Sequence, residues 1–421
     1  MEPTAEKIEG QTTDKFLTPP LILIFVTIFI DLIGFGMVIP ILPFYSQVEP
    51  FMATPFEIGL LVSIFSWMQV FFTPVFGALS DRFGRKPLIF ISLVGSAAGY
   101  LVVGLAGSLM MVFIGRAIGG IAGGSISTAQ AYVADVTTRE NRAKGMGLFG
   151  AAFGLGFILG PALAGILSKW GIAMPFYFAA ALSIANAIAV LLILPESLKP
   201  ELRRKVEADI ERKGRLAEMV EVLEGKDFRL VAIVYFLLIS AFSIMTYAYV
   251  LFTEHTFGYS AEQNGYLFAF VGMISIVMQG FVFGRLAKTF GESPLAVAGC
   301  LILTMGLFAI PFAGPAFGGL AGLLFVSALL AGGNAFATPA LSTMGSKLAA
   351  AHVQGRAMGV LQSLASLGRA IGPTVGGVLL NNQMDKVDRF TVFRTFWVAS
   401  GIMFVAFLVA AYAVRHLRGK V

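Results

Sequence analysis

Long apolar segments alternate with short polar loops over almost the whole chain. A helix that crosses about 30 Å of hydrocarbon needs roughly 20 apolar residues, and segments of that kind recur along the sequence. The pattern predicts twelve membrane-spanning helices, at residues 21–43, 56–80, 87–107, 109–134, 144–168, 173–194, 228–252, 262–287, 294–313, 317–345, 355–380 and 392–414. The expected fold class is therefore an all-α integral membrane protein.

Composition supports this fold and excludes several functions. Hydrophobic residues make up 57% of the 421 residues and charged residues only 13%, whereas soluble domains carry about 25% charge. The single cysteine, Cys300, rules out an intrachain disulfide and a Cys-rich metal site. No phosphate-binding loop of the form Gly-x4-Gly-Lys-Ser/Thr occurs. We expect no catalytic residues, no metal and no cofactor apart from a proton as coupling ion.

The basic residues give the orientation. With the amino terminus in the cytoplasm, 24 of the 30 Lys and Arg residues fall in cytoplasmic segments, so the positive-inside rule predicts that both termini are cytoplasmic. The net charge of +6 is scattered among loops and does not indicate a nucleic-acid partner. We expect a multi-pass protein of the inner (plasma) membrane, functional as a monomer.

The chain repeats itself. Met146-Gly147, Gly156, Gly160-Pro161 and Gly165 recur 212 positions later, from Met358 to Gly377. A second internal repeat relates residues 77–82 to residues 280–285. Two six-helix halves are therefore expected, at 21–194 and 228–414, with a substrate site between them. A cytoplasmic tail (1–20), a partly helical linker (195–227) and a second tail (415–421) complete the chain; a small regulatory domain is the alternative for the linker.

Four motifs stand out along the chain: the loop signature at 77–87, the first-helix pattern from Asp31 to Pro43, Arg116 to Gly120, and the Gly-Pro stretch from Gly150 to Gly165. Together they resemble the motifs of the major facilitator superfamily, most closely those of its twelve-helix drug/proton antiporters, which include the tetracycline exporters. The resemblance covers nearly the whole chain. One departure is Gly99, which stands where tetracycline exporters carry an acidic residue within helix three, and it argues against tetracycline itself as the substrate.

The resemblance implies gating and packing roles for two of these motifs. The gating motif comprises Gly77, Asp81, Arg82, Gly84, Arg85 and Lys86, with Asp135 as the implied partner of Arg85. Its charges would stabilise the outward-facing state and separate when the inner side opens; a merely topogenic basic loop is the alternative. The helix-five motif comprises Gly150, Gly154, Gly156, Gly160 and Pro161, which allow close packing and a bend.

Two charged side chains within the first half suggest proton coupling. Asp31 lies roughly 16 Å from the cytoplasmic edge of its helix, and Arg116 lies roughly 11 Å from the outer end of helix four. A carboxylate at that depth is costly and marks a function or a partner. We expect Asp31 to titrate and Arg116 to hold its charge when the site is empty. The alternative is a static structural pair.

In the second half, Arg369 has no obvious acidic partner. It could bind an anionic group or repel a cation; alternatively it snorkels or bonds to backbone carbonyls. Other polar and aromatic residues within spans are candidates for lining a substrate cavity, with interhelical packing as the alternative: Trp67, Gln69, Tyr235, Tyr247, Gln279, Asn334 and Gln362.

The sequence thus predicts a secondary transporter that exports an amphipathic, drug-like small molecule in exchange for protons, by alternating access of its two halves. Its partners would be that molecule, protons and the lipid bilayer. A transporter of an endogenous anion, lipid or metabolite that uses Arg116 and Arg369 is the first alternative. A transporter-like sensor is the second.

Overall fold

The structure is a computed structural model that describes residues 18–137, 142–198, 225–316, 318–348 and 354–416. Most of the two predicted tails, at 1–17 and 417–421, and most of the predicted linker, at 199–224, lie outside the described residues. The described part is helical throughout, apart from short connections and one isolated bridge between Gly314 and Gly318.

The first half holds six long helical segments. They are α1 (Pro19–Gln47), α2 (Pro55–Phe83), α3 (Arg85–Gly104), the continuous run of α4 (Leu109–Ala122), η1 (Gly123–Ser125) and α5 (Ile126–Val136), then α6 (Arg142–Leu167) with η2 (Ser168–Trp170), and α7 (Met174–Ile193). Each matches a segment predicted from the apolar pattern. The structure adds the η1 interruption within the fourth segment.

The second half repeats this order. Its segments are α10 (Lys226–Phe257), the run of α11 (Ala261–Val277), η3 (Met278–Phe283) and α12 (Gly284–Phe290), then α13 (Glu292–Ala309) with η4 (Ile310–Phe312), α14 (Gly319–Leu348), α15 (Gln354–Leu380) and α16 (Arg389–His416). The η3 segment is a π-helical turn. Such turns often occur where a helix is locally distorted.

Length and composition suit these helices to a bilayer. Within the described residues, eleven helices are long and apolar enough to cross a membrane, and a shorter apolar helix covers Gly154–Trp170 in α6 and η2. The all-helical membrane fold predicted from the sequence is confirmed. Several helices run a few residues past their predicted ends; α10, for example, continues to Phe257, where Gly258 in a left-handed conformation (φ 67°) ends it.

Matching start signals show the internal repeat in the local structure. α2 begins with a capping box in which the Thr54 hydroxyl accepts from the Glu57 backbone N–H and the Glu57 carboxylate accepts from Thr54. α11, the second helix of the other half, begins with the same reciprocal pair between Ser260 and Gln263. Each box satisfies N–H groups that the first turn of a helix leaves unpaired.

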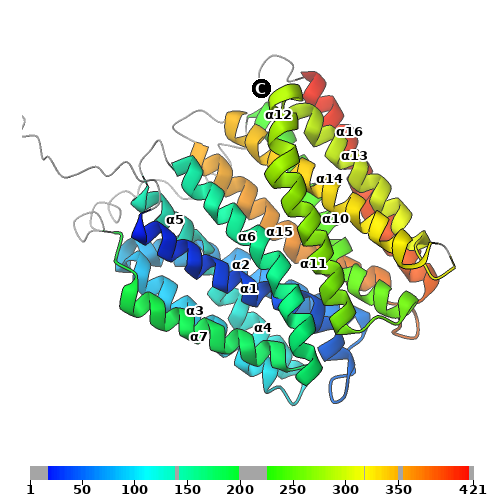
Figure 1. Cartoon of the computed structure of the whole chain (residues 1–421), viewed down its shortest axis with the longest axis horizontal. Coiled ribbons are helices and arrows are strands. Elements are labelled where there is room, and N and C mark those ends of the chain that lie inside the picture. Colours follow the sequence, from blue (N-terminus) through cyan, green and yellow to red (C-terminus); the bar gives the residue numbers. More distant parts are fainter. Residues whose placement is uncertain (1–17, 138–141, 199–224, 317, 349–353, 417–421) are drawn as a thin grey trace, which may run out of the picture.

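The two halves diverge toward the ends where the described chain begins and stops, which we call the terminal end, and meet at the opposite, far end (Figure 1). The most extensive contacts between the halves are made by α2 with α15 and by α6 with α11. α1 adds smaller contacts with α11 and α10. The molecule is thus closed at the far end.

Candidate functional site

Glycines form the two main crossings between the halves. At Gly59 of α2, an added Cβ would lie 2.5 Å from the carbonyl oxygen of Pro373 in α15. At Gly265 of α11, an added Cβ would lie 2.6 Å from the carbonyl oxygen of Pro161 in α6. Pro161 and Pro373 are the repeat partners separated by 212 positions. The Gly-Pro motif therefore supplies a matching inter-half contact in each half.

The other glycines of the helix-five motif pack α6 on α1. An added Cβ at Gly156 would lie 2.7 Å from the Leu32 Cβ, and one at Gly160 would lie 2.7 Å from the Ile33 carbonyl oxygen. Nothing lies within 4 Å of the Cβ position of Gly154, and Gly150 falls in the first turns of α6, where only the backbone is described. Gly156 and Gly160 thus hold α6 at backbone contact with the helix that carries Asp31.

Polar contacts also join the halves at the far end. They are hydrogen bonds from Gln47 Nε2 to Glu254 Oε2 (2.8 Å), from Thr374 Oγ1 to Ser63 Oγ (2.8 Å) and from the Tyr247 hydroxyl to the Pro55 carbonyl, and the ion pair between Lys169 Nζ and Glu262 Oε1 (2.8 Å). Tyr247, predicted as a cavity residue, is therefore a buried inter-half contact in this state.

At the terminal end, the gating motif forms a charge network. Arg85 contacts Asp81 Oδ1 at 2.5 Å through Nη1 and Asp135 Oδ2 at 3.2 Å through Nε. The Glu196 carboxylate accepts from the backbone N–H groups of Arg85 and Lys86 at the start of α3, where the helix dipole favours negative charge. The sequence analysis did not predict a role for Glu196. The available signal was an acidic residue at the end of span six, next to a basic loop.

The other residues of the gating motif shape the connection between α2 and α3. The Gly77 carbonyl accepts from the Ser80 hydroxyl at 2.8 Å, and the Arg82 guanidinium lies 5.4 Å from the centroid of the Phe83 ring. Gly84 has φ 108°, a region that side chains rarely adopt. Gly84 thus allows the tight connection between α2 and α3.

The network is intact in this structure. The Arg85–Asp135 pair joins α3 to α5, both in the first half, while the two halves diverge at the terminal end. The separation of these charges when the inner side opens stays a prediction.

The second half carries a charge-reversed counterpart that the sequence reasoning missed. Gly291 (φ 80°) precedes α13 as Gly84 precedes α3, 207 positions earlier. Glu292 at the start of α13 contacts Lys347 at the end of α14, with Nζ 2.9 Å from Oε2. The corresponding pair in the first half is Arg85 with Asp135. The signal was the shared Gly-x-x-Pro spacing at 84–87 and 291–294.

Asp31 and Arg116 lie in one neighbourhood but do not form a pair. Tyr100 of α3 is within electrostatic reach of both groups, and its ring packs at Gly34, one turn after Asp31. Arg116 Nε donates to the Leu61 carbonyl at 3.1 Å. Within the described residues, no hydrogen bond or ion pair joins Asp31 to Arg116. Asp31 is partly buried in α1, about 12 residues or roughly 18 Å from its start.

An aromatic cluster that the sequence reasoning missed lies beside these charges. The Phe35 ring centroid is 5.1 Å from that of Phe65 and 5.7 Å from that of Phe157. The Arg116 guanidinium lies 4.7 Å from the Phe65 centroid, in cation–π contact. Phe35 follows Asp31 by four residues, so the two side chains share a helix face. This spacing was the available signal.

The remaining cavity candidates fall into two groups, those with a hydrogen bond or ring contact and those without a side-chain hydrogen bond. Gln69 Nε2 donates to the Gly123 carbonyl (3.1 Å), at the η1 interruption, and Asn334 Oδ1 accepts from Thr338 (2.8 Å). Trp67 stacks with the exposed Phe71 at 6.0 Å. Two glutamines have no side-chain hydrogen bond in the described part of the chain: Gln279, which is exposed in η3, and Gln362, which is partly buried in α15.

Arg369 is held on α15 by its own helix and by an aromatic neighbour. Its Nη2 donates to the Ser366 hydroxyl at 2.9 Å, and Tyr235 of α10 is within electrostatic reach. No carboxylate pairs with Arg369 among the residues that the structure describes.

Gly99 lies at a close helix crossing. An added Cβ there would be 2.9 Å from both the Gly115 carbonyl oxygen and the Gly119 backbone nitrogen. The crossing of α3 and α4 leaves no room for a side chain. The acidic residue of the tetracycline-exporter pattern has no space at this position.

Comparisons with known proteins agree with this architecture. The model of the Major Facilitator Superfamily matches residues 24–373. Tetracycline resistance protein, class B, of Escherichia coli is 31% identical over 362 residues, which cover 85% of this chain and 88% of the relative. Multidrug resistance protein 2 of Bacillus subtilis is 30% identical, with 86% and 88% covered. The human organic anion transporter MFSD10 aligns with a TM-score of 0.69 at 26% identity, over 94% of this chain and 100% of that one. The chain belongs to the major facilitator superfamily, whose members are transporters and not enzymes.

Proposed function

We propose that this transporter exports a lipophilic, drug-like cation in exchange for protons, with Asp31 as the titrating group. One observation carries the proposal: Asp31 is a carboxylate within a membrane span that no Lys or Arg neutralises in the described structure, and it lies beside an aromatic cluster. A lipophilic cation would satisfy both features, since it brings a positive charge and an apolar body.

Exchange follows from competition for one carboxylate. A bound cation favours the ionised form of Asp31, and a proton neutralises the same group. Arg116 is committed to the Leu61 carbonyl and the Phe65 ring, so it leaves the Asp31 carboxylate to the proton and the cation. The relatives named as multidrug and tetracycline resistance proteins support export of a drug-like substrate.

The proposed topology indicates the side of the membrane to which the described state is open. Basic residues concentrate in the segments at the terminal end, which the positive-inside rule assigns to the cytoplasm. On this assignment the described state is inward-open, because the far end is closed. Protonation of Asp31 would then accompany return to this state after release outside.

The test measures protons directly. Lipophilic cations, tetracyclines and organic anions are added in turn to detergent-solubilised protein in weak buffer with a pH-sensitive dye. Cations should release protons from the native chain and none from Asp31→Asn. Asp385→Asn removes an exposed carboxylate in the loop before α16 and should behave as the native chain. Cation binding without proton release in the native chain contradicts the proposal.

A second candidate is transport of an organic anion. Arg369 carries it, because this guanidinium lacks a carboxylate partner in the described structure, and the human organic anion transporter shares the fold at 26% identity. In the same panel, anion binding that Arg369→Gln abolishes and Asp31→Asn preserves would replace the first proposal with this one.

A further inference from the structure

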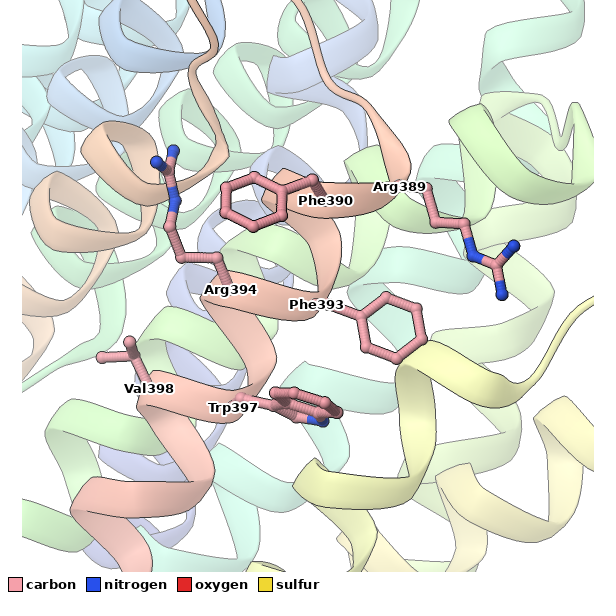
Figure 2. A pocket seen from close by; sticks show the side chains of 6 residues that line it. All are labelled: Arg389, Phe390, Phe393, Arg394, Trp397 and Val398. Atoms are coloured by element: carbon pink, nitrogen blue, oxygen red, sulfur yellow. The ribbon is translucent and has the colours of Figure 1, made fainter.

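A groove with a charged rim lies along the first turns of α16 at the far end. Its volume is about 780 Å³, and the side chains that line it follow one face of the helix: Arg389, Phe390, Phe393, Arg394, Trp397 and Val398. Figure 2 shows the two arginines on opposite sides of the groove near the start of the helix, with Trp397 two turns further on. The groove therefore runs from a cationic rim into an apolar floor.

Aromatic packing fixes the floor. The Trp397 ring lies parallel to that of Phe308 at 5.5 Å, and its Nε1 faces the Phe308 carbonyl at 3.4 Å. The Phe393 ring packs edge-on against Trp397 at 5.2 Å and against Phe312 at 5.1 Å. Phe390 is 71% exposed and Trp397 44% exposed. Because α16 is a membrane-spanning helix, these exposed rings face lipid.

The two arginines differ in how many of their N–H donors are already hydrogen-bonded. Arg394 donates through Nε and Nη2 to the Leu379 carbonyl (2.9 and 2.5 Å) and through Nη2 to the Asn381 carbonyl (3.0 Å). These carbonyls end α15, so the Arg394 charge is fixed in place by a helix C-terminus. Arg389 makes a ring contact with Phe393 at 5.7 Å and no hydrogen bond or ion pair within the described residues.

The neighbouring carboxylates do not neutralise Arg389. Asp388 accepts from Asn382 Nδ2 and from the Thr391 backbone N–H, both at 2.8 Å. These bonds keep the pKa of Asp388 below its usual range. Asp385 accepts from Asn381 Nδ2 at 2.7 Å. The guanidinium of Arg389 thus keeps its N–H donors available at the level where α16 begins.

We propose that this groove binds an anionic phospholipid. The phosphate headgroup contacts Arg389 and is held over the fixed charge of Arg394, while an acyl chain lies on Phe390, Trp397 and Val398. Lipid of some kind must cover the apolar floor of a membrane-spanning helix, and the charge of the rim selects the headgroup. Each basic residue near a bilayer surface favours an anionic lipid by about fivefold.

Trp397 is a built-in reporter for this site. The chain has three tryptophans, so replacing Trp67 and Trp170 with Phe leaves Trp397 alone. The full-length protein is reconstituted into bilayers that contain phosphatidylglycerol or phosphatidylcholine with brominated acyl chains, which quench tryptophan at contact. Competition between the two lipids gives their relative binding constant at Trp397.

Two variants separate site binding from general charge. In the single-tryptophan chain, phosphatidylglycerol should bind at least about fivefold more tightly than phosphatidylcholine. Arg389→Gln should reduce this ratio toward one. Lys386→Gln removes an exposed positive charge from the loop just before α16, outside the groove, and should leave the ratio unchanged. Equal quenching by both lipids in the native sequence overturns the proposal, and so does an equal loss in the two variants.

Discussion

Replacing Gly265 with Ala should open the far end of the molecule. The added Cβ would lie 2.6 Å from the Pro161 carbonyl oxygen and 2.9 Å from the Gly165 Cα. Both contacts are with backbone of the other half, so a side-chain rotation cannot relieve them. The helices α6 and α11 must separate by several tenths of an ångström for the methyl group to fit.

The magnitude follows from the cost of overpacking. Inserting a methyl group into a close contact costs about 1–3 kcal/mol. The crossing of Gly265 with Pro161 exists only while the far end is closed, so the cost falls on this state alone. The gain in helix propensity from Gly to Ala is common to both states and cancels. The ratio of the open to the closed far end should therefore rise about 5- to 150-fold.

The chain suits a distance measurement between the halves. Its single cysteine, Cys300, is buried and can be replaced by Ala, and spin labels can be attached at Leu105 and Met384, which are 66% and 75% exposed at the far end. Pulsed electron paramagnetic resonance in lipid nanodiscs reports the distribution of distances between them. Gly265→Ala should add a population at longer distance.

Matched substitutions complete this experiment. Gly59→Ala affects the pseudo-symmetric crossing, where the added Cβ would lie 2.5 Å from the Pro373 carbonyl oxygen, and should shift the population in the same direction. Gly401→Ala in α16 has nothing within 4 Å of its Cβ and should leave the distances unchanged. A native distance distribution in both Gly265→Ala and Gly59→Ala would refute the reasoning that these crossings close the far end.

Three further predictions concern packing and charge. Gly99→Asp should lower the thermal melting temperature in detergent, because the new side chain meets the Gly115 backbone at 2.9 Å; overpacking of this kind costs about 1–3 kcal/mol, and an unchanged melting temperature would contradict the close crossing. Glu292→Lys and Lys347→Glu should each slow transport or lower stability more than the double exchange, which restores the ion pair; additive effects would show that the pair is not coupled. Arg85→Gln leaves two carboxylates without their cation at a partly buried site and should reduce the melting temperature more than Arg85→Lys does.

The hydrophobic pattern was sufficient to predict the spans because a bilayer imposes one length on every crossing helix. It could not locate the breaks within spans. η1 begins at Gly123 in a run of small residues, and η3 includes Gln279 and Gly280. Neither break lowers the mean hydropathy of its segment below that of a membrane span. Averaging hydropathy along the chain therefore does not detect them.

The site was predicted less completely because height along a helix does not give side-chain direction. The similar depths of Asp31 and Arg116 allowed the two side chains to meet, yet the Arg116 guanidinium turns to the Leu61 carbonyl and the Phe65 ring. A backbone carbonyl and an aromatic face are strong alternative partners for a guanidinium in a membrane. Tyr100 then lies within reach of both charges. Which partner Arg116 contacts depends on how its helix is rotated about its own axis, and the hydrophobic pattern does not determine that rotation.

The repeat shows where to look for function in a molecule of this kind. The features that the halves share are packing devices, as at Gly59 and Gly265, where each crosses a Gly-Pro motif of the other half. The features that differ carry charge. Arg369 lies 212 positions after Phe157, so one repeat position holds a guanidinium in the second half and a ring of the aromatic cluster in the first. Symmetric packing lets the halves rock about a common axis, whereas discrimination between substrates requires that the two faces present different chemistry. The asymmetric position Arg369 is therefore one at which substitutions should change what is transported and not how the halves move, and we expect the same of Asp31.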